Sequence, residues 1–345
     1  MSIEILDPTQ YAGWDSLVLG CPSYSFFHSS AWAWALQDAY GYRPLYFTIF
    51  DGSALSACLP MMEVDSFLTG RRGVSLPFTD CCEPIVSTID QFGELFEKAA
   101  QYGKQRGWKL LELRGANGYL RDSMPASTYL THSLDLTAGE DQVFSSFRES
   151  NKRNIRKAQT SGVKVQITTS KEAVIQFCRL NQMTRREHGL PPQPYRFFEK
   201  VYEHVISKGF GFVALAFLEN VAIAASVYFH FGEAAIYKYG ASDKRYQHVR
   251  PNNLVMWEAI RKCIQDGRAN LSLGRTDVGA EGLRQFKTGW GAIEQMLSYY
   301  RYVTKVGAFV CDGKKKMNGT SSKVFSLVPL PVLRAAGSLL YRHMG

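Results

Sequence analysis

The sequence has no apolar run that is long enough to cross a membrane. The longest run, residues 210–218, ends at Glu219 and Asn220 and falls short of the roughly 20 residues that a spanning helix needs. The first residues have neither the basic segment nor the apolar segment of a secretory signal. We therefore expect a cytoplasmic protein.

Motifs for several kinds of chemistry are also missing. The seven cysteines have no C-x-x-C pair and no regular spacing, so we expect reduced thiols. No H-E-x-x-H or His/carboxylate cluster is present, and we expect no metal. The absence of G-x-G-x-x-G after a strand, of a Walker loop and of G-x-S-x-G argues against dinucleotide, nucleotide triphosphate and covalent-nucleophile enzymes.

The length and the charge of the chain are informative in turn. The 345 residues are 46% hydrophobic and 21% charged, which suits two domains with a substantial core each. Much of the net charge of +9 lies at two places: residues 301–345 carry eight Lys/Arg against one acid, and residues 148–157 carry five against one. Such clusters favour a polyanionic partner, or are solvated helix faces.

Two kinds of segment occur twice along the chain. β-Hairpins are expected within residues 45–61 and 211–231, and helix–glycine–strand units within residues 92–114 and 253–274. The hairpins lie 168 residues apart and the helix–strand units 160 apart, which predicts a duplicated domain. We predict an N-terminal domain at residues 1–138, a C-terminal domain at 139–305 and a basic amphipathic tail at 306–345. The fold class is α+β (mixed α/β), with helices on both faces of a mixed sheet.

A cation-rich loop precedes the helix expected at residues 253–265. Pro251 suits the start of that helix, and Asn252 suits its N-cap. Free backbone N–H groups and the helix dipole favour phosphate at such a place, although a well-capped surface helix would have the same sequence. The candidate phosphate contacts are Arg245, Arg250, Asn252, Asn253, Arg156 and Lys157.

Arg275 and Lys287 follow two segments that leave the sheet, where open α/β sheets build their sites. Residues 286–291 are glycine-rich beside two aromatic side chains, so a ligand can approach the backbone closely. A lysine in such a pocket can place its ammonium against a developing oxyanion. The alternative is a surface lysine next to core aromatic residues.

These segments resemble the FemAB/FemX-type acyltransferases. The matching motifs are Leu273-Gly274-Arg275-Thr276, Phe286-Lys287, Trp290-Gly291-Ala292 and the basic stretch 151–158. The resemblance covers most of residues 25–304 and implies two tandem GNAT-like domains, each a mixed, mostly antiparallel sheet covered by helices. It implies transfer of an acyl or aminoacyl group to an amine, often on a cell-envelope precursor such as that of peptidoglycan or an exopolysaccharide.

The resemblance also implies roles for residues and co-substrates. It places Phe286 and Lys287 at the reactive end of the acyl donor and makes Arg275 an anion contact. It implies no tightly bound cofactor, with acyl-CoA or aminoacyl-tRNA as the donor. The choice stays open, because the chain lacks both the coiled-coil arm of peptidoglycan-bridge members and the glycine-rich pyrophosphate loop of acetyl-CoA users.

We expect direct attack of a neutral amine on the donor carbonyl, with no acyl-enzyme. Asp243 or Asp277 is the candidate general base, and both suit turns equally well. Tyr237 and Tyr239 alternate on one face of a strand and are candidates for the pocket wall, or for the core in the case of at least one of them.

Three further predictions concern partners. In the first half, Asp80 and Glu83 are candidates to hold the amino group of the acceptor. The tail alternates apolar and basic residues, which suits either contact with the inner face of the membrane near a lipid-linked acceptor or docking on the protein's own core. From a different class, the basic clusters suit a non-catalytic nucleic-acid-binding protein.

Overall fold

The computed structural model describes residues 2–311 and 328–345, and these form two compact units. Unit 1 consists of Met1–Leu130, Met296–Lys315 and Leu340–Gly345, and unit 2 of Thr131–Gln295 and Lys316–Leu339. The units interleave along the chain. This differs from the prediction of consecutive domains at 1–138 and 139–305 with a separate tail at 306–345.

Unit 1 is built on a mixed sheet with the strand order β1–β2–β3–β4–β5–β12. The strands are β1 (Ile3–Leu6), β2 (Arg43–Asp51), β3 (Ala54–Val64), β4 (Arg72–Val74), β5 (Leu110–Arg114), β12 (Ile293–Val303, from Met296 onward) and β13 (Ala308–Val310), which pairs with β12. The helices are α1 (Trp14–Leu19), the 3₁₀ helix Phe26–His28, α2 (Ser30–Tyr40) and α3 (Ile89–Gln105).

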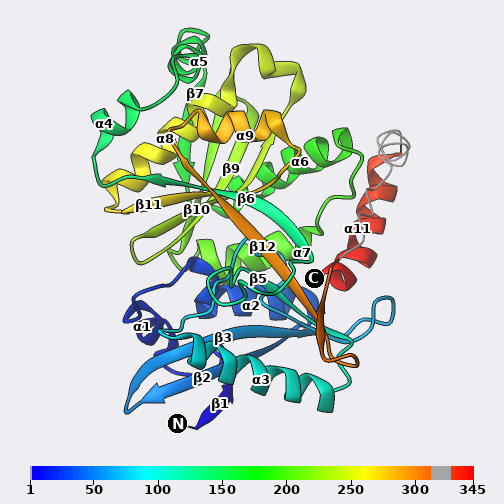
Figure 1. Cartoon of the computed structure of the whole chain (residues 1–345). Helices are drawn as coiled ribbons and strands as arrows, with labels where there is room; N and C mark the ends of the chain where they lie inside the picture. Colours follow the sequence, from blue (N-terminus) through cyan, green and yellow to red (C-terminus); the bar gives the residue numbers. More distant parts are fainter. Residues whose placement is uncertain (1, 312–327) are drawn as a thin grey trace. The chain divides into compact units, whose positions relative to one another are not determined.

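Alternation along β2 gives this sheet two covered faces. Phe47 is buried in one apolar cluster with Leu95 of α3, the helix that lies across β2 and β3 in Figure 1. The preceding residue, Tyr46, points to the opposite face, where its ring meets Trp14 of α1 edge to face at 5.5 Å.

Unit 2 has a second mixed sheet with the strand order β7–β8–β9–β10–β11–β6. The strands are β6 (Ser127–Asp135, from Thr131 onward), β7 (Lys164–Thr168), β8 (Gly211–Leu218), β9 (Val221–Phe231), β10 (Ala234–Ser242) and β11 (Asn270–Asp277). The helices are α4 (Glu140–Ser145), α5 (Glu149–Thr160), α6 (Lys171–Glu187), α7 (Tyr195–Val201), the π-helical turn Tyr202–Ile206, the 3₁₀ helix Lys244–Val249, α8 (Pro251–Gln265) and α9 (Glu281–Thr288). Helices α5 and α8 pack together on one face, and α6 covers the other.

The two sheets follow one plan. In each, an antiparallel hairpin (β2–β3 or β8–β9) is extended by a third antiparallel strand (β4 or β10). A helix then leads into a strand that pairs with the third strand in parallel (β5 or β11). Gly107 and Gly267 follow these helices in the left-handed conformation, with φ of 72° and 71°. The predicted fold class, two tandem mixed and mostly antiparallel sheets covered by helices, is confirmed.

The described part of the C-terminal tail forms α11 (Leu330–Met344). In unit 2, Leu333 is buried and Arg334 Nε donates to Gln182 Oε1 at 2.9 Å. In unit 1, Tyr341 is buried and packs at 5.8 Å from the ring of Phe78. These contacts are those of a helix that docks on the protein, one of the two predicted alternatives.

The most basic stretch of the tail is not part of this description. Lys314, Lys315, Lys316 and Lys323 lie outside the described residues. Among the described helices, none combines the length and the apolar character that crossing a membrane requires.

Candidate functional site

The central feature of unit 2 is the parting of two parallel strands. β10 and β11 pair from Ala234 and Asn270 to Ile236 and Ser272, and both strands continue for several residues beyond the last pair. A cleft of about 560 Å³ lies beside this end of β10. It is lined by Thr184, Glu187, His188, Ser226, Tyr237, Gly240, Ala241, Ser242, Lys244, Gln247, Asn252, Met256, Leu283 and Phe286.

A β-bulge in β10 shapes one wall of this cleft. The pairing with β9 shifts between Tyr237 and Tyr239, so that these two residues face opposite sides of the sheet. Tyr237 lines the cleft, and burial raises its pKa to about 12. Tyr239 packs on the other face between Phe177 and Phe198. Of the two predicted wall residues, the structure places only Tyr237 at the cleft.

The start of α8 forms a second wall, and here the predicted capping is wrong. The helix begins at Pro251, and its N-cap is Arg250 in the left-handed conformation (φ 58°). Asn252 lies in the first turn, lines the cleft and donates from Nδ2 to Ser242 Oγ at 3.2 Å. Asn253 is buried and its Nδ2 donates to Asn151 Oδ1 at 3.4 Å.

Asp243 caps the turn that leads to α8. Its Oδ1 accepts from the Arg245 backbone N–H, and both carboxylate oxygens accept from the Arg245 guanidinium at 2.6–3.1 Å. These hydrogen bonds lower the pKa of Asp243. A carboxylate with a lowered pKa is a weak base at neutral pH, so these contacts favour the alternative role of Asp243 as a turn residue. Asp277, at the end of β11, is exposed.

Lys287 is buried, with 3% of its surface exposed. Its Nζ donates to the carbonyl oxygens of Gly274 and Arg275, at 2.9 Å each, and so ties α9 to the end of β11. Phe286, the preceding residue, lines the cleft and meets Trp290 edge to face at 5.9 Å. The side chain of Arg275 is exposed.

The basic residues of α5 lie apart from the cleft lining. Arg156 and Lys157 are both exposed on this helix, which packs against α8. Their proposed contact with donor phosphates therefore stays a prediction.

Sequence reasoning missed the residues that α6 contributes to the cleft. Thr184 Oγ1 donates to the Ser242 carbonyl and accepts from the Ser242 N–H, at 3.1 Å each, which fixes the end of α6 beside β10. Glu187 and His188 then lie at the cleft. The only signal in the sequence is their position just before a Gly-Leu-Pro-Pro break.

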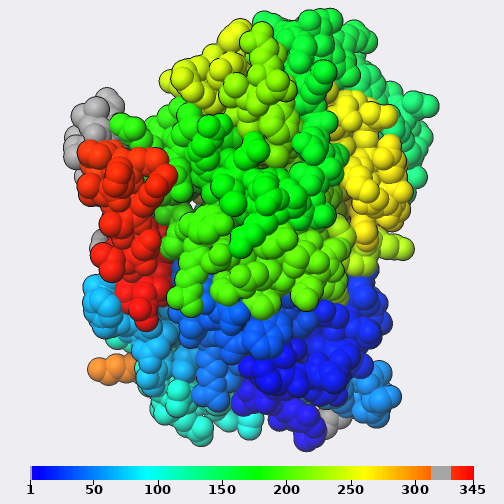
Figure 2. All heavy atoms as spheres, turned by 180° about the vertical axis from the view of Figure 1, so that it is seen from behind, coloured from blue at the N-terminus to red at the C-terminus, as the bar shows by residue number. Residues whose placement is uncertain are grey.

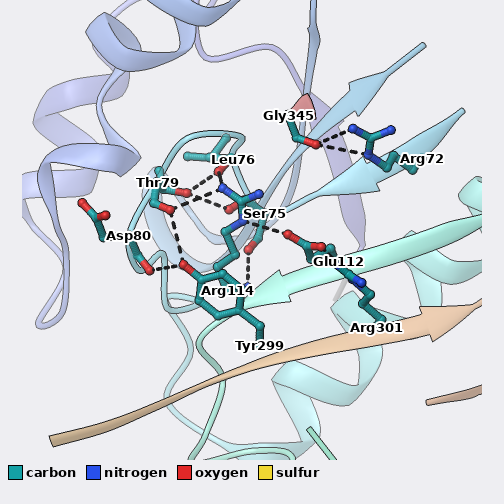
Figure 3. A network of polar contacts seen from close by, with 10 residues as sticks. All are labelled: Arg72, Ser75, Leu76, Thr79, Asp80, Glu112, Arg114, Tyr299, Arg301 and Gly345. Atoms are coloured by element: carbon teal, nitrogen blue, oxygen red, sulfur yellow. Dashed lines mark hydrogen bonds and ion pairs between the residues drawn. The ribbon is translucent and has the colours of Figure 1, made fainter. Parts of the chain in front are cut away.

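Asp80 and Glu83 belong to unit 1. The Asp80 carbonyl accepts from the Tyr299 hydroxyl at 2.5 Å, within the polar network of Figure 3. The Glu83 carboxylate accepts from the Ala116 N–H at 2.5 Å, and burial raises the pKa of Glu83. Their predicted role toward an acceptor stays a prediction.

The network in Figure 3 fills the place in unit 1 that corresponds to the cleft. Beyond the parallel pair of β4 and β5, Ser75 stays attached to β5, because its N–H donates to the Glu112 carbonyl at 2.8 Å and its Oγ accepts from the Arg114 N–H at 2.7 Å. The Arg114 guanidinium donates to Glu112 at 2.9 Å and to the Thr79 carbonyl at 3.3 Å.

Comparisons with known proteins agree with this architecture. Residues 145–288 match the family described as acetyltransferase (GNAT) domain. No curated protein matches the chain. Among solved structures, FemX superimposes with a TM-score of 0.70 at 13% identity, over 88% of this chain and 97% of its own.

Two further structures are similar over most of their length. L-PGS from Bacillus licheniformis gives a TM-score of 0.55 at 11% identity, over 94% of this chain and 99% of its own. A tandem GNAT protein from the clavulanic acid biosynthesis pathway gives 0.55 at 9% identity, over 88% and 98%. The resemblance inferred from the sequence is thereby confirmed at the level of the fold: the chain has the architecture of FemX and of the tandem GNAT protein. The match of residues 145–288 to the GNAT domain model supports acyl transfer as the class of activity.

Proposed function

We propose that this protein is an N-acyltransferase that reacts in the cleft of unit 2. It moves an acyl or aminoacyl group from acyl-CoA or aminoacyl-tRNA to an amine of a peptide or glycan precursor of the cell envelope. The observation that carries the proposal is the parting of β10 and β11 beside a cleft of about 560 Å³, with an aromatic wall on one side and the start of a long helix on the other.

The start of α8 is the side of the cleft that suits the phosphates of a donor. Lys244 and Asn252 line the cleft there, and Arg250 is exposed at the helix N-cap. A helix of 15 residues directs the positive end of its dipole to this point. Both candidate donors carry phosphate, so this wall alone does not favour one of them.

The end of α6 is the side that suits the acceptor. Glu187 supplies a carboxylate, and His188 supplies an imidazole. A carboxylate attracts the ammonium form of an amine, and either group can take its proton before attack. Asp277, exposed at the end of β11, stays the predicted alternative base.

The chemical step is a direct transfer. The amine nitrogen forms a bond to the donor carbonyl carbon, the carbon–sulfur or carbon–oxygen bond to the carrier breaks, and the base takes the amine proton. The carrier leaves as a thiolate, or as a ribose hydroxyl whose oxygen receives the proton that the base has taken from the amine. The extra residue of the bulge beside Tyr237 leaves backbone groups outside the β-ladder, and an N–H donor there suits the oxygen that becomes negative.

Lys287 stabilises the end of β11 without lining the cleft itself. Its two bonds to β11 carbonyls hold the end of that strand against α9, next to Phe286 at the cleft. We assign it a positioning role. Direct contact of its ammonium with the acyl oxygen, the role that the resemblance implies, stays a prediction.

The test uses the full chain with a panel of acyl-CoAs, aminoacyl-tRNAs and amine acceptors, with the product identified by mass spectrometry. Lys244→Ala should raise KM for the productive donor by about tenfold, the value of one charge-assisted hydrogen bond. Lys262→Ala is the matched control, because Lys262 lies in the last turn of the same helix and pairs with Asp266. Equal effects of the two substitutions on KM would show that the donor does not bind at this wall of the cleft.

The nucleic-acid-binding alternative gives a different result in the same assay. Random oligonucleotides would then bind tightly with a steep salt dependence, and no donor would yield a product. Stabilisation by oligonucleotides alone, in a thermal-shift measurement with the same donors, would replace our proposal.

A further inference from the structure

One edge of unit 1 exposes several large apolar side chains. They come from the loop after β3, the turn after β12 and the end of α11. Their exposed fractions are 85% for Phe67, 56% for Leu68, 71% for Val306, 40% for Leu340 and 59% for Met344. Side chains of this size are normally exposed singly, so a group of them requires an explanation.

These residues belong to one continuous surface, which we call the amphiphilic edge. The Phe67 ring meets the His343 ring at 4.5 Å, and His343 Nδ1 lies 3.0 Å from Ser66 Oγ, so the loop and the end of α11 are in contact. On the other side, Lys109 packs against Gly70 of the same loop, and its carbonyl accepts from the Thr304 N–H at 3.3 Å.

The figures agree with these contacts. The end of α11, the loop after β3 and the turn after β12 gather on the same margin of unit 1 in Figure 1 and, from behind, in Figure 2.

Positive charge surrounds the apolar residues. Lys109, Lys305 and Arg342 are exposed, and each is next to or in contact with one of the three segments of the edge. Asp65 is the acid of the loop, and Arg71 neutralises it at 2.5 Å. The edge therefore combines projecting apolar groups with a net positive rim.

We propose that the amphiphilic edge binds the surface of an anionic lipid bilayer. Phe67, Leu68 and Met344 enter the boundary between headgroups and acyl chains, and Lys109 and Lys305 contact anionic headgroups. The charge decides between this partner and a second copy of the chain, because a symmetric contact would bring two sets of the same cations together. The proposal concerns only the attachment of unit 1 and does not depend on the acyl-transfer chemistry.

The experiment is sedimentation of the full chain with vesicles of phosphatidylcholine alone, or of equal parts phosphatidylcholine and phosphatidylglycerol. Binding should occur with the anionic vesicles and fall with salt. Each cation near the surface contributes a factor of about five, so Lys109→Glu with Lys305→Glu should lower partitioning by more than tenfold. Phe67→Ser with Leu68→Ser should lower it on the order of tenfold.

The matched control is Ile89→Ser. Ile89 is 62% exposed and also belongs to unit 1, but it begins α3, about 24 Å along that helix from the end that leads to Lys109. Circular dichroism checks that every variant is folded. The proposal would be overturned if the protein bound both vesicle types equally or bound neither, or if the Phe67/Leu68 variant bound as well as the original protein. It would also be overturned if the original protein were a dimer and the Phe67/Leu68 variant a monomer. Acyl transfer to a soluble amine should be unchanged in all these variants, which separates a failure of this proposal from a failure of the proposed function.

Discussion

Replacing Lys287 with methionine tests the link between α9 and β11 most directly. The substitution keeps an unbranched apolar stem of similar volume, with sulfur in place of one methylene group, and removes the ammonium. The carbonyl oxygens of Gly274 and Arg275, which now accept hydrogen bonds from Nζ, would both lose this donor. The site is closed to water at the Gly274 carbonyl and partly open to water at the Arg275 carbonyl.

The expected cost follows from these two acceptors. A buried polar group that loses its partner costs about 1–3 kcal/mol, and the partly open Arg275 carbonyl should lie at the low end. Burying an ammonium is itself unfavourable, and removing it offsets part of the loss. We expect Lys287→Met to lower the free energy of unfolding by about 2–4 kcal/mol.

The assay is urea denaturation with Lys262→Met as the control. Lys262 is a partly exposed lysine whose ion pair with Asp266 should contribute less than about 1 kcal/mol. Activity under conditions where both variants are folded then separates two roles. A lysine that contacts the acyl oxygen gives a kcat loss on the order of 10² to 10³ with KM retained, whereas a lysine that positions β11 changes both constants. A free energy of unfolding within 0.5 kcal/mol of the original protein, a typical change for a neutral surface substitution, would refute the reasoning.

Three further outcomes follow from the structure. Glu112→Gln should cost about 3–5 kcal/mol, because it leaves two guanidinium groups without their carboxylate, and urea denaturation measures this. Burial raises the pKa of Glu112, but the two arginines outweigh burial, and the net effect is a lowered pKa. The stabilisation by ionised Glu112 is therefore present above the unfolded-state pKa of about 4.3 and is lost as the pH falls through the folded-state pKa. Melting temperatures measured over a series of pH values check this. Asp243→Ala should cost about 0.5–2 kcal/mol through the lost cap, and a loss of all activity with unchanged stability would instead restore Asp243 as the base. Gly240→Ala should displace the Tyr237 hydroxyl, because a Cβ at position 240 would overlap it. We expect kcat/KM to fall by a larger factor than the equilibrium constant of folding. An unchanged kcat/KM would show that Tyr237 does not form part of the cleft wall.

Much of the fold was predictable because it rests on local signals. The turn at Asp51-Gly52 and the glycines after α3 and α8 act within a few residues, and their spacing indicated the duplication. Which strand forms the last strand of each sheet was not predictable. β12 completes the sheet of unit 1 from a part of the chain that is far from strands β1 to β5 of that unit. β6, the first strand of unit 2, completes its sheet by lying next to β11, the last strand of that unit along the chain. No local pattern records such long-range pairing.

The site was predictable in its region and less so in its details. Phe286, Tyr237 and Asn252 do line the cleft. The bulge that separates Tyr237 from Tyr239 was invisible, because strict alternation is the default expectation for a strand. The contribution of α6 was also missed, because it depends on a tertiary contact between Thr184 and Ser242.

The duplication also raises the question of why the cleft belongs to unit 2. The offset of 160 residues that relates the helix–strand units makes Gly274 of β11 the equivalent, in the second repeat, of Arg114 of β5 in the first. The arginine fills the space beyond the parallel pair and binds the loop carbonyl of Thr79, as Figure 3 shows, whereas the glycine has no side chain and adopts a φ of 71° that few other residues tolerate. Lys287 then binds the Gly274 carbonyl and holds the strand in its diverging course. The same plan thus gives a strand end closed by arginine in unit 1 and one that leaves room for a ligand in unit 2.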